Sequence, residues 1–319
     1  MRILLAPLNW LGRQGTNAVA IVVFLAVLTP QVGAAMKDYL AEIVIALLCL
    51  AFIRVDIAVL RQHLSRPHIV IAATAWTVIG IPSLFGGACI LFGIRDSAPD
   101  LFTGLVMQFS ASPMMAAPAL VMLMGLDATL VLIVLVASTA LIPVTAPFFA
   151  WLFVGAELSV SPMVLGLKLL TILGSAIIVS VIVRRVAGMA GIRRYRAEID
   201  GINIIVLYIF AAPVMQRFLP ALLHEPLTVL WVMLLALALF AAYYIVTVLL
   251  FIRAGRDQAL ALGIMTSLRN LGLLIAATGG AVPELSWIYF AASQFPIHLA
   301  PALLKWLATR KGAARAGNS

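Results

Sequence analysis

The 319 residues are 64% hydrophobic and only 10% charged, and their mean hydropathy is +1.14. A soluble domain of this length cannot hide so much apolar surface in one core, so lipid must be the solvent for most side chains. The net charge of +9 does not indicate nucleic-acid binding, because the basic residues cluster in short tracts between apolar runs, where juxtamembrane anchors lie.

Ten apolar runs, separated by charged residues, prolines or glycines, predict ten membrane-spanning helices. A spanning helix needs about 20 mostly apolar residues, and backbone groups in hydrocarbon must bond within their own segment. We therefore expect an all-α polytopic membrane protein. In chain order the predicted spans are 17–35, 39–53, 68–93, 101–124, 128–154, 162–187, 199–219, 227–252, 257–281 and 285–308.

The distribution of basic residues predicts the orientation. If the N-terminus is cytoplasmic, most of the 21 Lys and Arg residues fall in cytoplasmic segments, and only Lys37, Arg95 and Arg217 fall in outside loops. The positive-inside rule then places both termini in the cytoplasm of an inner or plasma membrane. Residues 309–319 form a basic cytoplasmic tail.

Ten spans divide near Gly155 into two sets of five, residues 1–155 and 161–308. An odd number of helices per half forces the halves into opposite orientations, so the sequence predicts two inverted repeats. In such transporters the site forms near the midplane where corresponding helices are interrupted, because unwound backbone offers unpaired N–H and C=O groups.

The fourth helix of each half carries such an interruption. In span 101–124, Pro113 and Pro118 each remove a helical hydrogen bond at mid-depth. Span 257–281 has a polar stretch from Gly263 to Gly272. Kinks and small-residue packing faces are the structural alternative, but matching positions favour a site. The candidate binding residues are Ser110, Ser112, Thr266, Ser267, Arg269 and Asn270, with Pro113, Pro118 and Gly272 as helix breakers; serine and threonine hydroxyls also bond back to their own helix.

These segments resemble the bile acid:sodium symporter family over roughly residues 54–307. No single motif decides the resemblance, but several weak motifs stand in the right order and spacing. The matching stretches are Arg66-Pro67-His68 through Ile81-Pro82 for the third helix, Gly104 through Gly155 for the fourth and fifth, and Asp257-Gln258-Ala259-Leu260 leading to Arg269-Asn270-Leu271-Gly272-Leu273 for the ninth.

The resemblance implies two domains, with helices four and nine crossing where they unwind. The core domain would comprise 68–154 and 227–308, and the panel domain 17–53 and 162–219. Substrate would bind between the domains, and their relative movement would give alternating access.

The family also holds two sodium ions through oxygen ligands near the crossing. Most of those positions lack a side-chain oxygen here, so we expect no sodium at them and no other metal or cofactor. The substituted positions are Ala117, Pro118, Val131, Leu135 and Met265, with Thr77 and Arg269 standing where the family has glutamines.

Arg269 is the most informative residue, because a guanidinium at the bilayer centre costs about 2.5 kcal/mol or more. No Asp or Glu lies well inside any predicted span. Two partners are therefore open. Arg269 either faces the cavity and pairs with an anionic substrate, or it occupies the vacated sodium site and bonds backbone carbonyls of the broken helices. Both alternatives predict that sodium is unnecessary.

The leading hypothesis is a secondary transporter that lies in the lipid bilayer and moves a small organic anion without sodium coupling. A monomer would suffice for this function. His298 offers a proton-linked step, although a hydrogen-bonded packing histidine is commoner. Sodium symport with displaced ligands is a second hypothesis. Arsenite-type efflux would require a cysteine thiolate near Ser110, and this stretch contains no cysteine. A non-transporting sensor is a further alternative, and an enzyme is not expected, because no span holds paired carboxylates or a catalytic triad.

Overall fold

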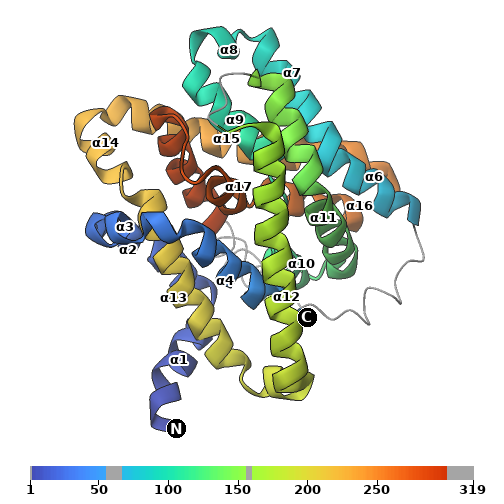
Figure 1. The fold of residues 1–319 in the computed structure, drawn as a ribbon. Helices are drawn as coiled ribbons and strands as arrows, with labels where there is room; N and C mark the ends of the chain where they lie inside the picture. Colours follow the sequence, from blue (N-terminus) through green and yellow to red (C-terminus); the bar gives the residue numbers. More distant parts are fainter. Residues whose placement is uncertain (1, 55–66, 156–159, 300–319) are drawn as a thin grey trace, which may run out of the picture.

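The computed structural model describes residues 2–54, 67–155 and 160–299 (Figure 1). The described part of the chain is helical and contains no strand, which confirms the expected all-α class. The predicted tail at 309–319 and the end of the tenth predicted span lie outside the described residues.

Five helical segments are long and apolar enough to cross a membrane, as expected of a multi-pass membrane protein. Three contain local irregularities: α6 and α7 join through a π-helical turn, α12 changes direction at Gly188, where φ is 65°, and a turn at Gln216 and Arg217 separates α13 from α14. The five are α6–η2–α7 (Pro67–Ala75, Trp76–Gly80, Ile81–Leu91), α11 (Ala128–Phe153), α12 (Pro162–Arg194), α13 with α14 (Arg196–Met215, Phe218–His224) and α15 with η4 (Pro226–Phe251, Ile252–Ala254).

The other predicted spans form shorter helical pieces. Residues 17–35 divide into α2 (Thr16–Leu28) and α3 (Pro30–Met36), because Pro30 disfavours helical geometry at Thr29. After η1 (Lys37–Tyr39), α4 (Leu40–Phe52) has 13 residues, about 20 Å against a hydrocarbon core of about 30 Å. A last helix is described over 284–299. The fourth and ninth spans are both broken, into α9 (Pro99–Ser110) with α10 (Ala117–Leu123) and α16 (Arg256–Ser267) with α17 (Leu271–Thr278), while a short helix, α8 (Ile94–Ser97), precedes α9.

The N-terminal helix α1 (Arg2–Gln14) was not predicted from the apolar runs. It packs on α13, where glycines at positions 12 and 201 let the two backbones approach so closely that an added Cβ would collide with a carbonyl. Asn9 donates to Glu198 across this contact at 3.0 Å. Residues 5–14 of α1 and 17–28 of α2 are bent by 100° to one another, the geometry of either a broken span or a re-entrant loop.

The helices form two packed sets, and the long helix α12 contacts both of them. In one set α13 packs against α1, α2, α3 and α4, and α12 itself packs against α4. In the other set α11 packs against α6, α9, α10 and α16, and α15 packs against α16. The short helix α17 lies where the sets meet, because it contacts α4, α12 and α9. This position places the end of α16 and the start of α17 deep in the molecule.

Candidate functional site

The two broken helices meet through their extended segments. Residues 111–116 separate α9 from α10, and residues 268–270 separate α16 from α17. The segments run antiparallel: Met114 N–H donates to the Leu268 carbonyl at 2.7 Å, and Asn270 N–H donates to the Ser112 carbonyl at 2.7 Å. Pairing across the crossing therefore replaces part of the helical hydrogen bonding that both breaks remove.

Pro113 explains why the first break forms where it does. A proline has no N–H and disfavours helical geometry at the residue before it. Pro113 stands opposite Arg269 in the antiparallel bridge, and the two hydrogen bonds come from the flanking residues. The position in the pair that needs no N–H is thus occupied by the residue that lacks one.

Arg269 is held at this crossing by two contacts. Its side chain is only 1% exposed. Nη1 donates to the carbonyl of Ala111 at 2.7 Å, and the guanidinium carbon lies 5.4 Å from the centre of the Tyr243 ring on α15. Nε and Nη2 have no hydrogen-bond partner among the described residues.

The free energies of these two contacts can be set against the cost of burying the guanidinium at the crossing. Insertion scales put an arginine at the centre of a spanning helix at about 2.5–3.5 kcal/mol. A hydrogen bond from a charged donor contributes about 1.5–3 kcal/mol, and a desolvated cation–π contact about 2 kcal/mol. The carbonyl and the ring therefore offset part of this cost, and two donor atoms of the guanidinium stay unpaired among the described residues.

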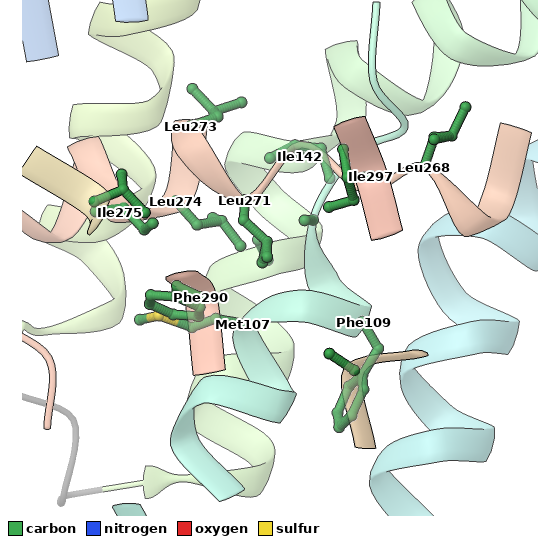
Figure 2. Close-up of a cluster of buried hydrophobic side chains, with 14 of the residues drawn as sticks. Met107, Phe109, Ile142, Leu268, Leu271, Leu273, Leu274, Ile275, Phe290 and Ile297 are labelled. Carbon is green, nitrogen blue, oxygen red and sulfur yellow. The ribbon is translucent and has the colours of Figure 1, made fainter. Parts of the chain in front are cut away.

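Apolar side chains enclose the crossing on several sides (Figure 2). Leu268 and Leu271 flank the second break, Ile142 approaches from α11, and Ile297 approaches from the last described helix. All four are buried. Such a wall excludes water and lowers the local dielectric, which strengthens every electrostatic interaction of Arg269.

The candidate hydroxyl residues fall into two kinds. Ser110 and Ser112 are buried beside the first break, and their Oγ atoms have no partner in the described part of the molecule. Thr266 and Ser267 bond back to the Gly263 carbonyl at 3.1 and 2.9 Å, as the structural alternative predicted. The two serines therefore keep hydrogen-bonding capacity at the crossing.

His298 is also buried. Its Nδ1 lies 2.9 Å from the carbonyl of Gln294, one turn earlier in its helix, as in a packing histidine. Its Nε2 has no partner within the described ranges.

One face of the crossing is open. Asn270 is only partly buried, as are Met114 and Met115, and Ala116 is exposed. These four residues are the least buried of those at the two breaks.

Two of the predicted helix breakers lie just inside the following helices instead. Pro118 occupies the first turn of α10, where a proline is tolerated. Gly272 occupies the first turn of α17, where the Phe210 ring of α13 packs so closely that an added Cβ would lie 2.6 Å from its Cζ. The lack of a side chain at Gly272 thus allows α13 and α17 to pack closely. The break itself ends before this residue, because α17 begins at Leu271.

A polar relay beside the crossing was missed from the sequence. The Trp76 indole, in the π-helical turn, donates to Thr247 Oγ1 at 2.9 Å, and Thr247 shares a second bond of 2.9 Å with Thr266. Tyr243 lies one turn earlier on α15, facing Arg269. The available signal was a threonine and a tyrosine spaced four apart inside an otherwise apolar span.

Four of the positions at which the sequence analysis expects no sodium ligand are apolar and buried. Ala117, Val131, Leu135 and Met265 are all fully buried apolar residues. The hydroxyl of Thr77 donates to Ala73, one turn earlier in its own helix, at 2.7 Å. The positive charge at the crossing is thus the guanidinium, which already has a carbonyl partner.

Comparison with models of known protein families finds none that matches this chain, and no curated protein matches it. The crossing of the two broken helices is therefore the feature that bears most directly on function. This arrangement offers a fixed cation in a dry setting, two unpaired guanidinium donor atoms, two unpaired serine hydroxyls and one open face. Chemically, such a set stabilises a negative charge.

Proposed function

We propose that this chain is a secondary transporter that moves a small organic anion by alternating access without sodium. Arg269 supplies the fixed positive charge that bound sodium provides in bile acid:sodium symporters, the family to which we assign it. The observation that carries the proposal is the buried guanidinium bonded to the Ala111 carbonyl where two broken helices cross.

The proposal includes ten spans in two inverted repeats, and the lengths of the helical pieces support the repeat. In the first half a 25-residue segment, Pro67–Leu91, precedes a broken helix of 12 and then 7 residues. In the second half the 26-residue helix α15 precedes a broken helix of 12 and then 8 residues. Two halves that repeat this order of long and broken helices, and whose broken segments run antiparallel, are the pattern expected of inverted repeats.

The packing partners support a division into panel and core domains. The α13 set, formed by α1 to α4 with α12 and α13, matches the panel, and the α11 set, with α6, α7, α9, α10, α15 and α16, matches the core. The crossing belongs to the core, and α17 brings it against α4 and α12 of the panel. We place the substrate at this junction, where α17 brings the crossing against the panel helices.

Of the two roles open to Arg269, the geometry favours the tethered cation. A guanidinium that is 1% exposed and bonded to Ala111 is closed to a substrate in this conformation. Its charge still acts across the crossing, because the surroundings are apolar. Asn270 and the backbone of 114–116 are then the groups that touch the anion directly.

Ligand-induced thermal stabilisation tests the binding half of this proposal. Carboxylates and sulfonates screened against the protein in detergent should include one that raises its melting temperature, by mass action on the folded state. The shift should disappear in Arg269→Ala. A panel without any stabilising anion, or a shift that the Ala variant retains in full, argues against the proposed site.

Flux into proteoliposomes tests the transport half. Uptake of the stabilising anion should proceed at equal rates with sodium or with choline outside. Uptake that requires a sodium gradient would support the sodium-coupled symporter with displaced ligands. Binding without any flux would support a sensor.

A further inference from the structure

A second group of charges surrounds a small cleft away from the crossing. The cleft has a volume of about 230 Å³ and lies where η1, the end of α13, the end of α17 and the last described helix meet. Its lining includes Lys37, Asp38, Gln216, Arg217, Gly280 and Trp287.

Cations outnumber acids in this cleft. Lys37 and Arg217 are two of the three basic residues that the positive-inside argument assigns to the outer face. A third cation, Lys168 on α12, places its Nζ 3.9 Å from where a Cβ of Gly279 would lie. Asp38 is the one acid in the lining, and neither Lys37 nor Arg217 forms an ion pair with it in the described part of the chain. The cleft therefore carries a net positive charge in contact with solvent.

The end of α17, which forms part of the wall of the cleft, is capped by backbone hydrogen bonds. Gly279 N–H donates to the Ala276 carbonyl at 3.1 Å and Gly280 N–H to the Ile275 carbonyl at 3.2 Å, which is the Schellman cap of α17. Both glycines have positive φ, 66° and 73°. This cap pairs two of the four carbonyls at the helix end, which would otherwise repel an anion.

Trp287 positions one of the cations of the cleft, Arg217. Its indole nitrogen donates to the Val214 carbonyl at 3.1 Å, and the Arg217 guanidinium carbon lies 5.9 Å from its ring. Arg217 is thus held over the cleft by an aromatic ring that is itself anchored to α13.

The cleft and the crossing lie at opposite ends of one short helix. α17 begins at Leu271, directly after Arg269 and Asn270, and ends at the Gly279–Gly280 cap. Its eight residues span about 12 Å. An anion held in the cleft is therefore one short helix away from the buried guanidinium.

We propose that this cleft is an anion-binding site, which takes a small carboxylate or sulfonate on the outer face before the anion reaches the crossing. Its role as an entry site rests on the proposed transport function; its preference for anions does not. The volume lies below the roughly 300–1,000 Å³ of pockets for drug-sized ligands, so the site fits a small anion rather than one of steroid size.

The local charge is tested by placing a thiol in the cleft. Gln216→Cys, made in the full chain and purified in detergent, is modified with two methanethiosulfonate reagents of similar size, one ending in a sulfonate and one in a trimethylammonium group. The native Cys49 and Cys89 are buried, and the unsubstituted chain measures their background reaction. The measured quantity is the ratio of the two rates, divided by the same ratio for a free thiol.

We expect this ratio to exceed 1 by about threefold or more, because a single charge at contact distance in water changes local concentrations by such a factor. Adding Lys37→Gln or Arg217→Gln should lower it, and adding Asp38→Asn should raise it, a gain that misfolding does not mimic. Arg95→Gln, which removes the third outer basic residue from α8, is the matched control and should leave it unchanged.

A ratio at or below 1, or one that ignores Lys37→Gln and Arg217→Gln, overturns the cleft as an anion site. The outcome is separate from that of the flux experiments. A low ratio with intact anion flux would contradict only the proposed anion site in the cleft. A high ratio without flux would contradict transport but would still support an anion-binding site.

Discussion

The two ends of α17 place positive charge in opposite surroundings. At its start Arg269 is buried, bonded to one carbonyl and enclosed by leucine and isoleucine side chains. At its end Lys37 and Arg217 are exposed around a cleft that also holds Asp38. A charge in a dry setting acts strongly on a few neighbours, whereas exposed charges are screened by water and salt. Changes at the crossing should therefore have large, salt-independent effects, and changes at the cleft small, salt-dependent ones.

The largest effect is expected from Arg269→Met, which removes the buried charge but keeps a long side chain. Anion flux should fall at least tenfold. The melting temperature should stay within about 5 °C or rise, because replacing a buried, partly unpaired charge by an apolar group is often neutral or stabilising. Flux and thermal unfolding are measured on the same preparation. A large loss of stability would show that the Ala111 contact outweighs the cost of burying the charge.

Gly272→Ala tests how tightly the crossing is pressed against α13. The added Cβ would lie 2.6 Å from Phe210, so the ring or the helix must move. Overpacking of this kind costs about 1–3 kcal/mol, measurable as a lower melting temperature.

Its matched control is Gly87→Ala on α7, where nothing lies within 4 Å of the added atom. That variant should be neutral or slightly stabilising. Equal losses in the two variants would contradict the close approach at Gly272.

Two variants of Tyr243 distinguish the contribution of its ring from that of its hydroxyl in holding Arg269. Tyr243→Phe keeps the ring and removes a buried hydroxyl without a partner in the described residues, so stability should change little. Tyr243→Leu loses a cation–π contact of about 0.5–2 kcal/mol, in addition to packing. In the Arg269→Met background the extra penalty of Leu over Phe should shrink, as a double-mutant cycle would detect. An unchanged penalty would mean that the ring does not act on the charge.

The smallest effect belongs to the cleft. Lys37→Gln should raise the KM for anion uptake from the outer side by at most about fivefold, the size of one unit charge at contact distance in water. Raising the salt from about 20 to 500 mM should abolish the difference, because the screening length falls well below 10 Å. The loss in Arg269→Met should persist at both salt concentrations. A Lys37 effect that is insensitive to salt would place that side chain in a dry site.

The helical class and several long spans were predictable because they depend on uninterrupted apolar runs such as 128–154 and 227–252. The break at Pro113 was predictable for a local reason, the missing N–H. The helix α1 was not, because its apolar residues cover one face and no run of spanning length exists. The π-helical turn at Trp76 escaped as well, since its partner Thr247 is distant in the sequence.

The site was predictable in its charge but not in its contacts. Arg269 stands out in any hydropathy profile, whereas the Ala111 carbonyl and the Tyr243 ring become its partners only when the helices cross. Gly272 shows the same limit: its sequence context suggested a helix breaker, and its neighbour Phe210 lies on a helix more than 50 residues earlier in the chain. The cleft escaped for the same reason, because its lining comes from four separate segments.

The central claim is that a tethered guanidinium replaces bound sodium, and the most direct measurement is anion flux in Arg269→Gln proteoliposomes with sodium and with choline. The wild-type chain should transport equally well in both salts. The Gln variant should be inactive in choline, and any activity that it regains should require sodium. Transport by the Gln variant at the wild-type rate in choline would contradict the account.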